Sequence, residues 1–65
     1  MASREKAERW AKDAEKRYMV RYCIVLVKNG QWMCEKLSFA RAHEGYKGRP
    51  CLSLTPEGEW QKEQL

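Results

Sequence analysis

The side chains best suited to chemistry in this chain are its single histidine and its three cysteines. An imidazole can act as a general base, and His43 stands just before a loop whose residues could bind a phosphate. Those residues are Tyr46, Lys47 and Arg49. No second catalytic group is fixed by the spacing, so a surface histidine in a loop is the simpler interpretation. We therefore expect a protein without enzymatic activity, with a His43-dependent ribonuclease as the alternative.

The cysteines are Cys23, Cys34 and Cys51. Their odd number, the lack of a Cys-x-x-Cys spacing and the lack of an apolar leader sequence indicate the reducing cytoplasm. Zinc accepts three thiolates and one histidine as ligands, so a zinc site formed by the three cysteines and His43 is chemically possible. Ligands that are spread singly along the chain are not typical of zinc sites. The sequence therefore predicts free thiols that fill the core, with no metal and no other cofactor.

Positive charge is concentrated in the middle of the 65-residue chain. The net charge is +4, and residues 17–50 carry seven Lys or Arg against two Glu, whereas residues 51–65 carry one Lys against three Glu. A cationic segment of this kind attracts nucleic acid or an acidic protein surface over long range. Because 34% of the residues are charged, no segment is apolar enough to span a bilayer, and we expect no membrane partner.

Residues 3–17 predict a helix. Ser3 can cap its start, and apolar residues recur at the spacing that lines one helical face. Three acidic residues precede basic residues by four positions, which favours a helix and predicts that these bases are paired on its outer surface. The pairs are Glu5 with Arg9, Glu8 with Lys12, and Asp13 with Arg17.

The next segment predicts an antiparallel β-hairpin, with strands over residues 19–28 and 31–38 around Asn29-Gly30. A type I′ turn would place Val27 opposite Trp32. Ile24 would then face the core, and Trp32 would lie on the opposite, free face. A type I turn followed by a G1 bulge would shift the register by one residue and exchange part of these two faces.

The remaining elements are a basic loop over residues 40–50, a strand over 51–54 and a helix over 56–64 capped by Thr55. The residues 38–45 fit either a short helix or a loop. We thus expect a single α+β domain over residues 1–65 with the order α-β-β-β-α and with its helices on one face of the sheet.

This order of elements resembles that of double-stranded-RNA-binding domains and of small mRNA-interferase toxins. The basic Lys-Lys-x-Ala-Lys helix start of the first family is absent, and His43 does not lie in a strand flanked by glycine and basic residues. The resemblance therefore covers the order of elements only and implies no function.

A binding surface is predicted where cations and aromatic rings are left free by the fold. The candidate residues are Arg21, Trp32, Lys36, Arg41, Tyr46, Lys47 and Arg49. Cations of this set would hold phosphates, and a ring would stack on a base. We expect a small non-enzymatic protein that contacts nucleic acid, or a nucleic-acid-processing complex, through the basic loop and the sheet face.

The alternative function is a protein inhibitor or adaptor, of the kind that phages and mobile elements encode. It would dock on a host protein complex through Trp32 and a cationic rim. A domain this small has little stability to spare, so a homodimer is open as well.

Overall fold

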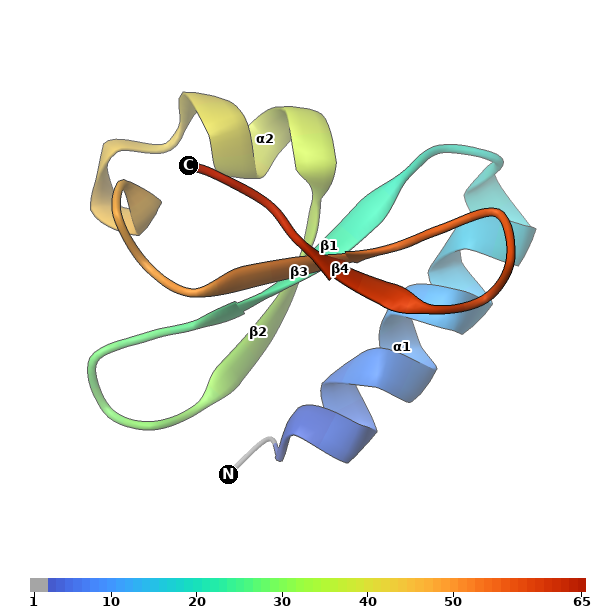
Figure 1. Cartoon of the computed structure of the whole chain (residues 1–65), viewed down its shortest axis with the longest axis horizontal. Coiled ribbons are helices and arrows are strands. Elements are labelled where there is room, and N and C mark those ends of the chain that lie inside the picture. The colour runs from blue at the N-terminus through green and yellow to red at the C-terminus, as the bar shows by residue number, and fades with distance from the viewer. Residues whose placement is uncertain (1–2) are drawn as a thin grey trace.

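The structure is a computed structural model that describes residues 3–65, and it confirms the α+β class (Figure 1). Its elements are α1 (Arg4–Tyr18), β1 (Tyr22–Leu26), β2 (Trp32–Lys36), α2 (Leu37–Ala42), the 3-10 helix η1 (Glu44–Tyr46), β3 (Cys51–Leu54) and β4 (Trp60–Lys62). The four strands form one antiparallel sheet in the order β2-β1-β3-β4. Within residues 3–65, no helix is both long enough and apolar enough to cross a membrane.

The predicted N-terminal helix is present as α1. The Ser3 hydroxyl accepts a hydrogen bond from the Lys6 backbone N–H, which satisfies one of the free donors at the helix start. The helix ends at Met19, which adopts the left-handed conformation with φ 59° and donates its N–H to the Glu15 carbonyl. Ala7 and Ala11 are fully buried. Because these side chains are small, the helix backbone lies close to the sheet.

The first hairpin forms around Asn29-Gly30, but its register differs by one residue from that of a type I′ turn. Leu26 lies opposite Trp32. Gly30 has φ 84° and donates its N–H to the Val27 carbonyl, whereas Asn29 does not have the positive φ that a type I′ turn requires. The turn is therefore of type I and is closed by a left-handed glycine. This is the type I turn with a G1 bulge, the second of the two registers expected from the sequence, and it places Trp32 on the other face of the sheet.

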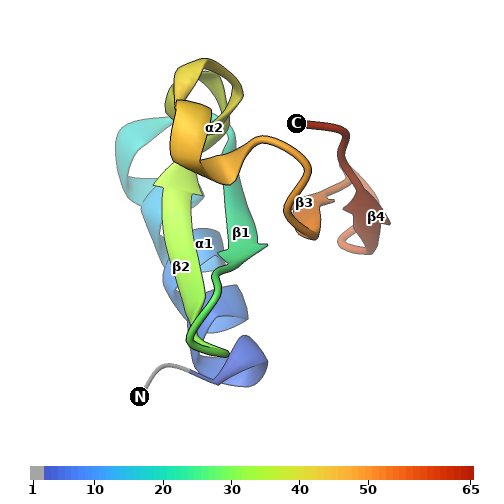
Figure 2. The same ribbon diagram turned by 90° about the vertical axis from the view of Figure 1, so that its left-hand side faces the viewer.

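The sheet has a small core on each of its faces, so the expectation of helices on one face is wrong. On one face Ala7 and Ala11 of α1 cover Ile24. Figure 2 shows α1 running behind β1 and β2. On the other face Leu37 and Ala40 of α2 pack against Cys23, Val25 and Cys51. Since β1 is buried on both sides, residues 23–25 are apolar without interruption instead of alternating.

The expected C-terminal helix over residues 56–64 is also wrong, because these residues form a turn and the strand β4. Gly58 has φ 87° and donates its N–H to the Thr55 carbonyl, while the Thr55 N–H donates to the Glu59 carbonyl. Pro56 occupies the second position of this turn, which proline favours as much as it favours a helix start. The positive φ of Gly58 is incompatible with a continuing helix, and Trp60 then pairs with Leu54 of β3.

Candidate nucleic-acid interface

One groove brings a tryptophan together with three cations at the sheet end where β2 begins and β4 ends. It has a volume of about 440 Å³. It is lined by Arg4, Trp32, Lys62, Glu63 and the segment from Gly48 to Leu52, which includes Arg49. We call it the Trp32 groove. Each cation comes from a different element: the first residue of α1, the loop before β3, and the last residue of β4.

Trp32 is held by the fold on the α1 face of the sheet. Its ring is half-buried and packs against the cluster of Ala7, Ala11 and Ile24. The prediction that this ring lies on a free face is therefore wrong, and the cause is the one-residue change of register. Because the rest of the ring is packed, the part of the ring that lines the groove is held in a fixed position.

Arg4 extends from the first turn of α1 over the Trp32 ring. Its guanidinium carbon lies 5.8 Å from the ring centre, within the range of a cation–π interaction. Its Nε donates to the Glu8 carboxylate at 2.8 Å. Glu8 therefore pairs with Arg4 instead of with Lys12 as predicted. Of the three predicted pairs, only that of Asp13 with Arg17, at 3.4 Å, is found within residues 3–65.

Arg49 and Lys62 supply charge to the groove without a carboxylate partner in the described chain. The Arg49 Nε donates to the Leu26 carbonyl at 2.9 Å, which fixes the direction of the side chain and leaves its terminal nitrogens for other acceptors. Lys62 is exposed and lies opposite Leu52, which places it on the same face of the sheet as Trp32. These two cations are free to bind an anion.

Arg21 and Arg41, two of the predicted binding residues, instead share the single carboxylate of Glu63. Their guanidinium groups lie 3.5 Å and 3.4 Å from its carboxylate. The buried Ser53 hydroxyl donates to the same carboxylate at 2.5 Å and accepts a hydrogen bond from Arg21 at 3.1 Å. We call these four residues the Glu63 cluster. The cluster forms because residues 60–62 are a strand, which brings the Glu63 N–H to the Cys51 carbonyl.

Tyr46 is used by the fold. Its hydroxyl donates to Glu35 at 2.5 Å, and its ring packs against the α2-side core. The hydrogen bond to Glu35, together with burial, raises the pKa of Tyr46 to about 12. The His43 ring stacks on Tyr46 at 4.4 Å, and its Nδ1 accepts a hydrogen bond from the Gly45 N–H. One ring nitrogen of His43 is therefore already used in a hydrogen bond within the loop.

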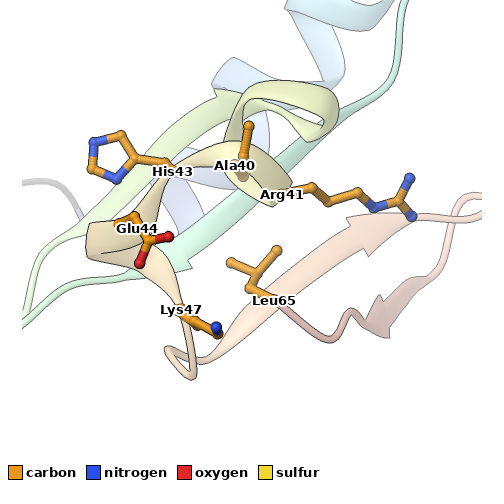
Figure 3. Close-up of a pocket in the computed structure, with 7 residues that line it drawn as sticks. Ala40, Arg41, His43, Glu44, Lys47 and Leu65 are labelled. Carbon is orange, nitrogen blue, oxygen red and sulfur yellow. The ribbon is translucent and has the colours of Figure 1, made fainter.

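Lys47 and Lys36 lie outside the Trp32 groove. Lys47 lines a separate pocket of about 110 Å³ beneath α2. Figure 3 shows the Leu65 side chain pointing into the space between Arg41 and Lys47, while the His43 ring points away from it. Lys36 is exposed at the far end of β2 and has no carboxylate within 4 Å in residues 3–65. Of the seven predicted residues, the structure brings only Trp32 and Arg49 together in the groove.

The cysteines lie on opposite faces of the sheet. Cys23 and Cys51 belong to the α2-side core, and Cys34 packs on the α1 side. Within residues 3–65 no three His, Cys, Asp or Glu side chains are grouped as metal ligands, so the zinc set with His43 is not assembled. Burial raises the pKa of Cys34 to about 11, and a hydrogen bond between the thiols, together with burial, raises the pKa of Cys23. Neither thiol is an activated nucleophile.

Sequence reasoning missed Arg4 and Lys62 as members of the groove. Lys62 falls within the expected helix over 56–64, and the run of Trp60 followed by three polar residues has no apolar–polar alternation that would have indicated a strand. Arg4 gave no local signal, because it reaches the groove only through the packing of α1 on β2.

The chain was compared with protein-family models, with curated proteins and with solved structures, and nothing matched. The function proposed below therefore depends on the chemistry of the Trp32 groove.

The Glu63 cluster is expected to stabilise the fold in a pH-dependent way. Replacing Glu63 with alanine would leave the buried Ser53 hydroxyl and two arginines without their shared partner, at a cost of about 1–3 kcal/mol in the free energy of unfolding. The hydrogen bond from Ser53 and the two arginine charges lower the pKa of Glu63 below its usual value. A lowered folded-state pKa gives stability that is complete above the unfolded pKa of about 4.3 and is lost as the pH falls through the folded pKa.

Urea unfolding measured between pH 7 and pH 2 checks this prediction. The wild type should lose stability over the acidic part of that range more steeply than Glu63→Ala does. Glu59 is exposed and forms no ion pair in residues 3–65, so Glu59→Ala serves as the control and should change stability by no more than about 0.5 kcal/mol. Equal stability of the two variants at pH 7 would mean that the Glu63 cluster contributes nothing.

Proposed function

We propose that this protein binds nucleic acid without catalysing a reaction and that the Trp32 groove is its contact site. The observation that carries the proposal is the meeting of one rigid indole with Arg4, Arg49 and Lys62 in one groove. Nucleic-acid-binding surfaces combine these two kinds of side chain, because cations hold the phosphates and an aromatic ring takes a base.

The distribution of charge supports the same proposal. Four of the thirteen Lys and Arg residues form ion pairs in the part of the chain that the structure describes, namely Arg4, Arg17, Arg21 and Arg41. Nine others have no such partner there and give the surface its excess of positive charge. This excess would speed the encounter with a polyanion, and the groove would fix where it is held.

The compartment we propose is the cytoplasm. All three cysteines are free thiols, which suits a reducing environment that also contains nucleic acid.

The salt dependence of binding tests the proposal. We expect a fluorescein-labelled RNA or DNA oligonucleotide of 20 nucleotides to bind, as measured by fluorescence anisotropy. Two phosphate contacts, from Arg49 and Lys62, give a slope of log affinity against log salt of about −1.4 to −1.8, so affinity should fall roughly 7- to 12-fold between 50 and 200 mM salt. Flat affinity over this range, or no binding at 50 mM salt, would exclude the proposed function.

A protein inhibitor or adaptor is the second candidate, and the position of β2 favours it. This strand is at the edge of the sheet, so one side of its backbone is open to a strand of a partner protein. A partner held in this way, with Trp32 as its anchor, would be lost from a pull-down with Trp32→Ala and retained with Arg49→Ala. If the partner is lost with both variants, the result would favour nucleic acid bound in the Trp32 groove.

A further inference from the structure

We infer that the Trp32 groove holds an unpaired nucleotide, so that the ligand is single-stranded nucleic acid. This inference rests on the proposed function and narrows it to one class of ligand. The volume of the groove, about 440 Å³, lies in the range of pockets that enclose small molecules, roughly 300–1,000 Å³. A groove of this volume has room for the base of one nucleotide.

The position of Trp32 points the same way. A duplex shows its phosphates and groove edges to a protein, and the faces of its bases are covered by their neighbours. An indole that is packed on one side and lines a recess on the other can stack only on a base whose face is free. Stacking of this kind is worth between about 5-fold and 150-fold in affinity.

Arg4 adds a second planar group beside the ring. Its guanidinium lies over the Trp32 ring and is held there by Glu8, so both planes are already placed before a ligand arrives. Arginine stacks on planar rings, whereas a lysine ammonium is a point charge with the same sign but no plane. Because 5.8 Å is too short for a base to lie between the two planes, a base in the groove would stack on the part of the ring that Arg4 leaves open and would meet the guanidinium at its edge.

The phosphates that flank such a base would meet Arg49 and Lys62. Glu63 also lines the groove, and an unpaired carboxylate there would repel a phosphate. Its charge is compensated by Arg21 and Arg41 on the other side of the sheet. These two arginines thus support phosphate binding without contacting the ligand.

The alternative ligand is a duplex bound along the outer face of α1, where Arg9, Lys12 and Lys16 are exposed and have no carboxylate partner in residues 3–65. Lys12 and Lys16 line a second recess of about 440 Å³, but no aromatic ring lines it. Trp10 of the same helix is half-exposed, with Lys6 over its ring at 5.4 Å. Trp10 therefore provides a matched control for Trp32, since it is a tryptophan beside a cation but outside the Trp32 groove.

The test compares a labelled 12-nucleotide RNA of mixed sequence with the same strand annealed to its complement, at 50 mM salt. We expect the full chain to bind the single strand at least 10-fold more tightly than the duplex. On the single strand, Trp32→Leu should lose at least 5-fold, Arg4→Lys at least 3-fold, and Trp32→Phe and Trp10→Ala less than 2-fold. Circular dichroism would verify that each variant is folded, and Arg4→Lys tests the groove even if Trp32→Leu unfolds.

Three results would overturn the inference, and they are distinguishable. If the duplex binds as tightly as the single strand and the salt dependence persists, the ligand class is wrong while nucleic-acid binding stands. If neither probe binds in a salt-dependent way, the proposed function fails together with the inference. Equal losses for Trp10→Ala and Trp32→Leu would also exclude the groove as the site.

Discussion

Replacing Ile24 with alanine is expected to unfold a large part of the protein at 25 °C. Ile24 is fully buried in the central strand β1, beneath Ala7 and Ala11 of α1. The loss of its side chain would leave a cavity that these two alanines are too small to fill. Such a substitution costs about 2–5 kcal/mol, and a domain of fewer than about 70–80 residues has only about 3–5 kcal/mol of stability.

Urea unfolding followed by circular dichroism measures this effect. Val20 is the control, because it is a β-branched residue of the same chain segment with 45% of its surface exposed. Val20→Ala should change the free energy of unfolding by no more than about 0.5 kcal/mol. If the two variants unfold at the same urea concentration, the packing of α1 on the sheet does not carry the stability of the fold.

The first hairpin shows what local sequence can and cannot predict. Asn29-Gly30 correctly marks the turn, because glycine adopts a positive φ without a steric cost. The same pair fits a type I′ turn and a type I turn with a bulge, and the choice between them depends on which face of β1 and β2 is packed. Burial of Ile24 beneath α1 is a tertiary contact, so the position of Trp32 was not predictable from the turn alone.

The prediction of a C-terminal helix, where the structure has a second hairpin, was wrong for a similar reason. Thr55-Pro56-Glu57 has the residues of a helix start, and the same residues suit a type I turn. Gly58 is the one local signal against a helix, because it costs a helix about 1 kcal/mol relative to alanine. The pairing of β4 with β3 is a tertiary contact that the local sequence does not show. That pairing then determines the position of Lys62 and Glu63.

The candidate site was predicted in part. Trp32 and Arg49 were expected and do share a groove. Arg41 and Tyr46 were expected to be free, but their partners Glu63 and Glu35 lie 22 and 11 residues away in the chain. Pairs at such separations leave no pattern in the sequence, whereas pairs four residues apart on a helix do.

Reversing the charge of Lys62 is expected to weaken nucleic-acid binding at least 10-fold. Lys62→Glu removes one phosphate contact from the Trp32 groove and places a repulsive carboxylate there. The slope of log affinity against log salt should become shallower by about 0.7–0.9, which is the value of one contact. Lys62 is exposed and is not required by the core, so the variant should fold as the wild type does.

Lys16→Glu is the matched control for the central claim that the groove is the binding site. Both substitutions change the net charge from +4 to +2, and Lys16 is exposed near the other end of α1, about 18 Å along the helix from Arg4. The measurement is the affinity of both variants for the same single-stranded oligonucleotide at 50 mM salt. Our account predicts a loss of at least 10-fold for Lys62→Glu and of less than 3-fold for Lys16→Glu. Equal losses would show that binding follows the net charge of the protein, and a larger loss for Lys16→Glu would place the site on the outer face of α1.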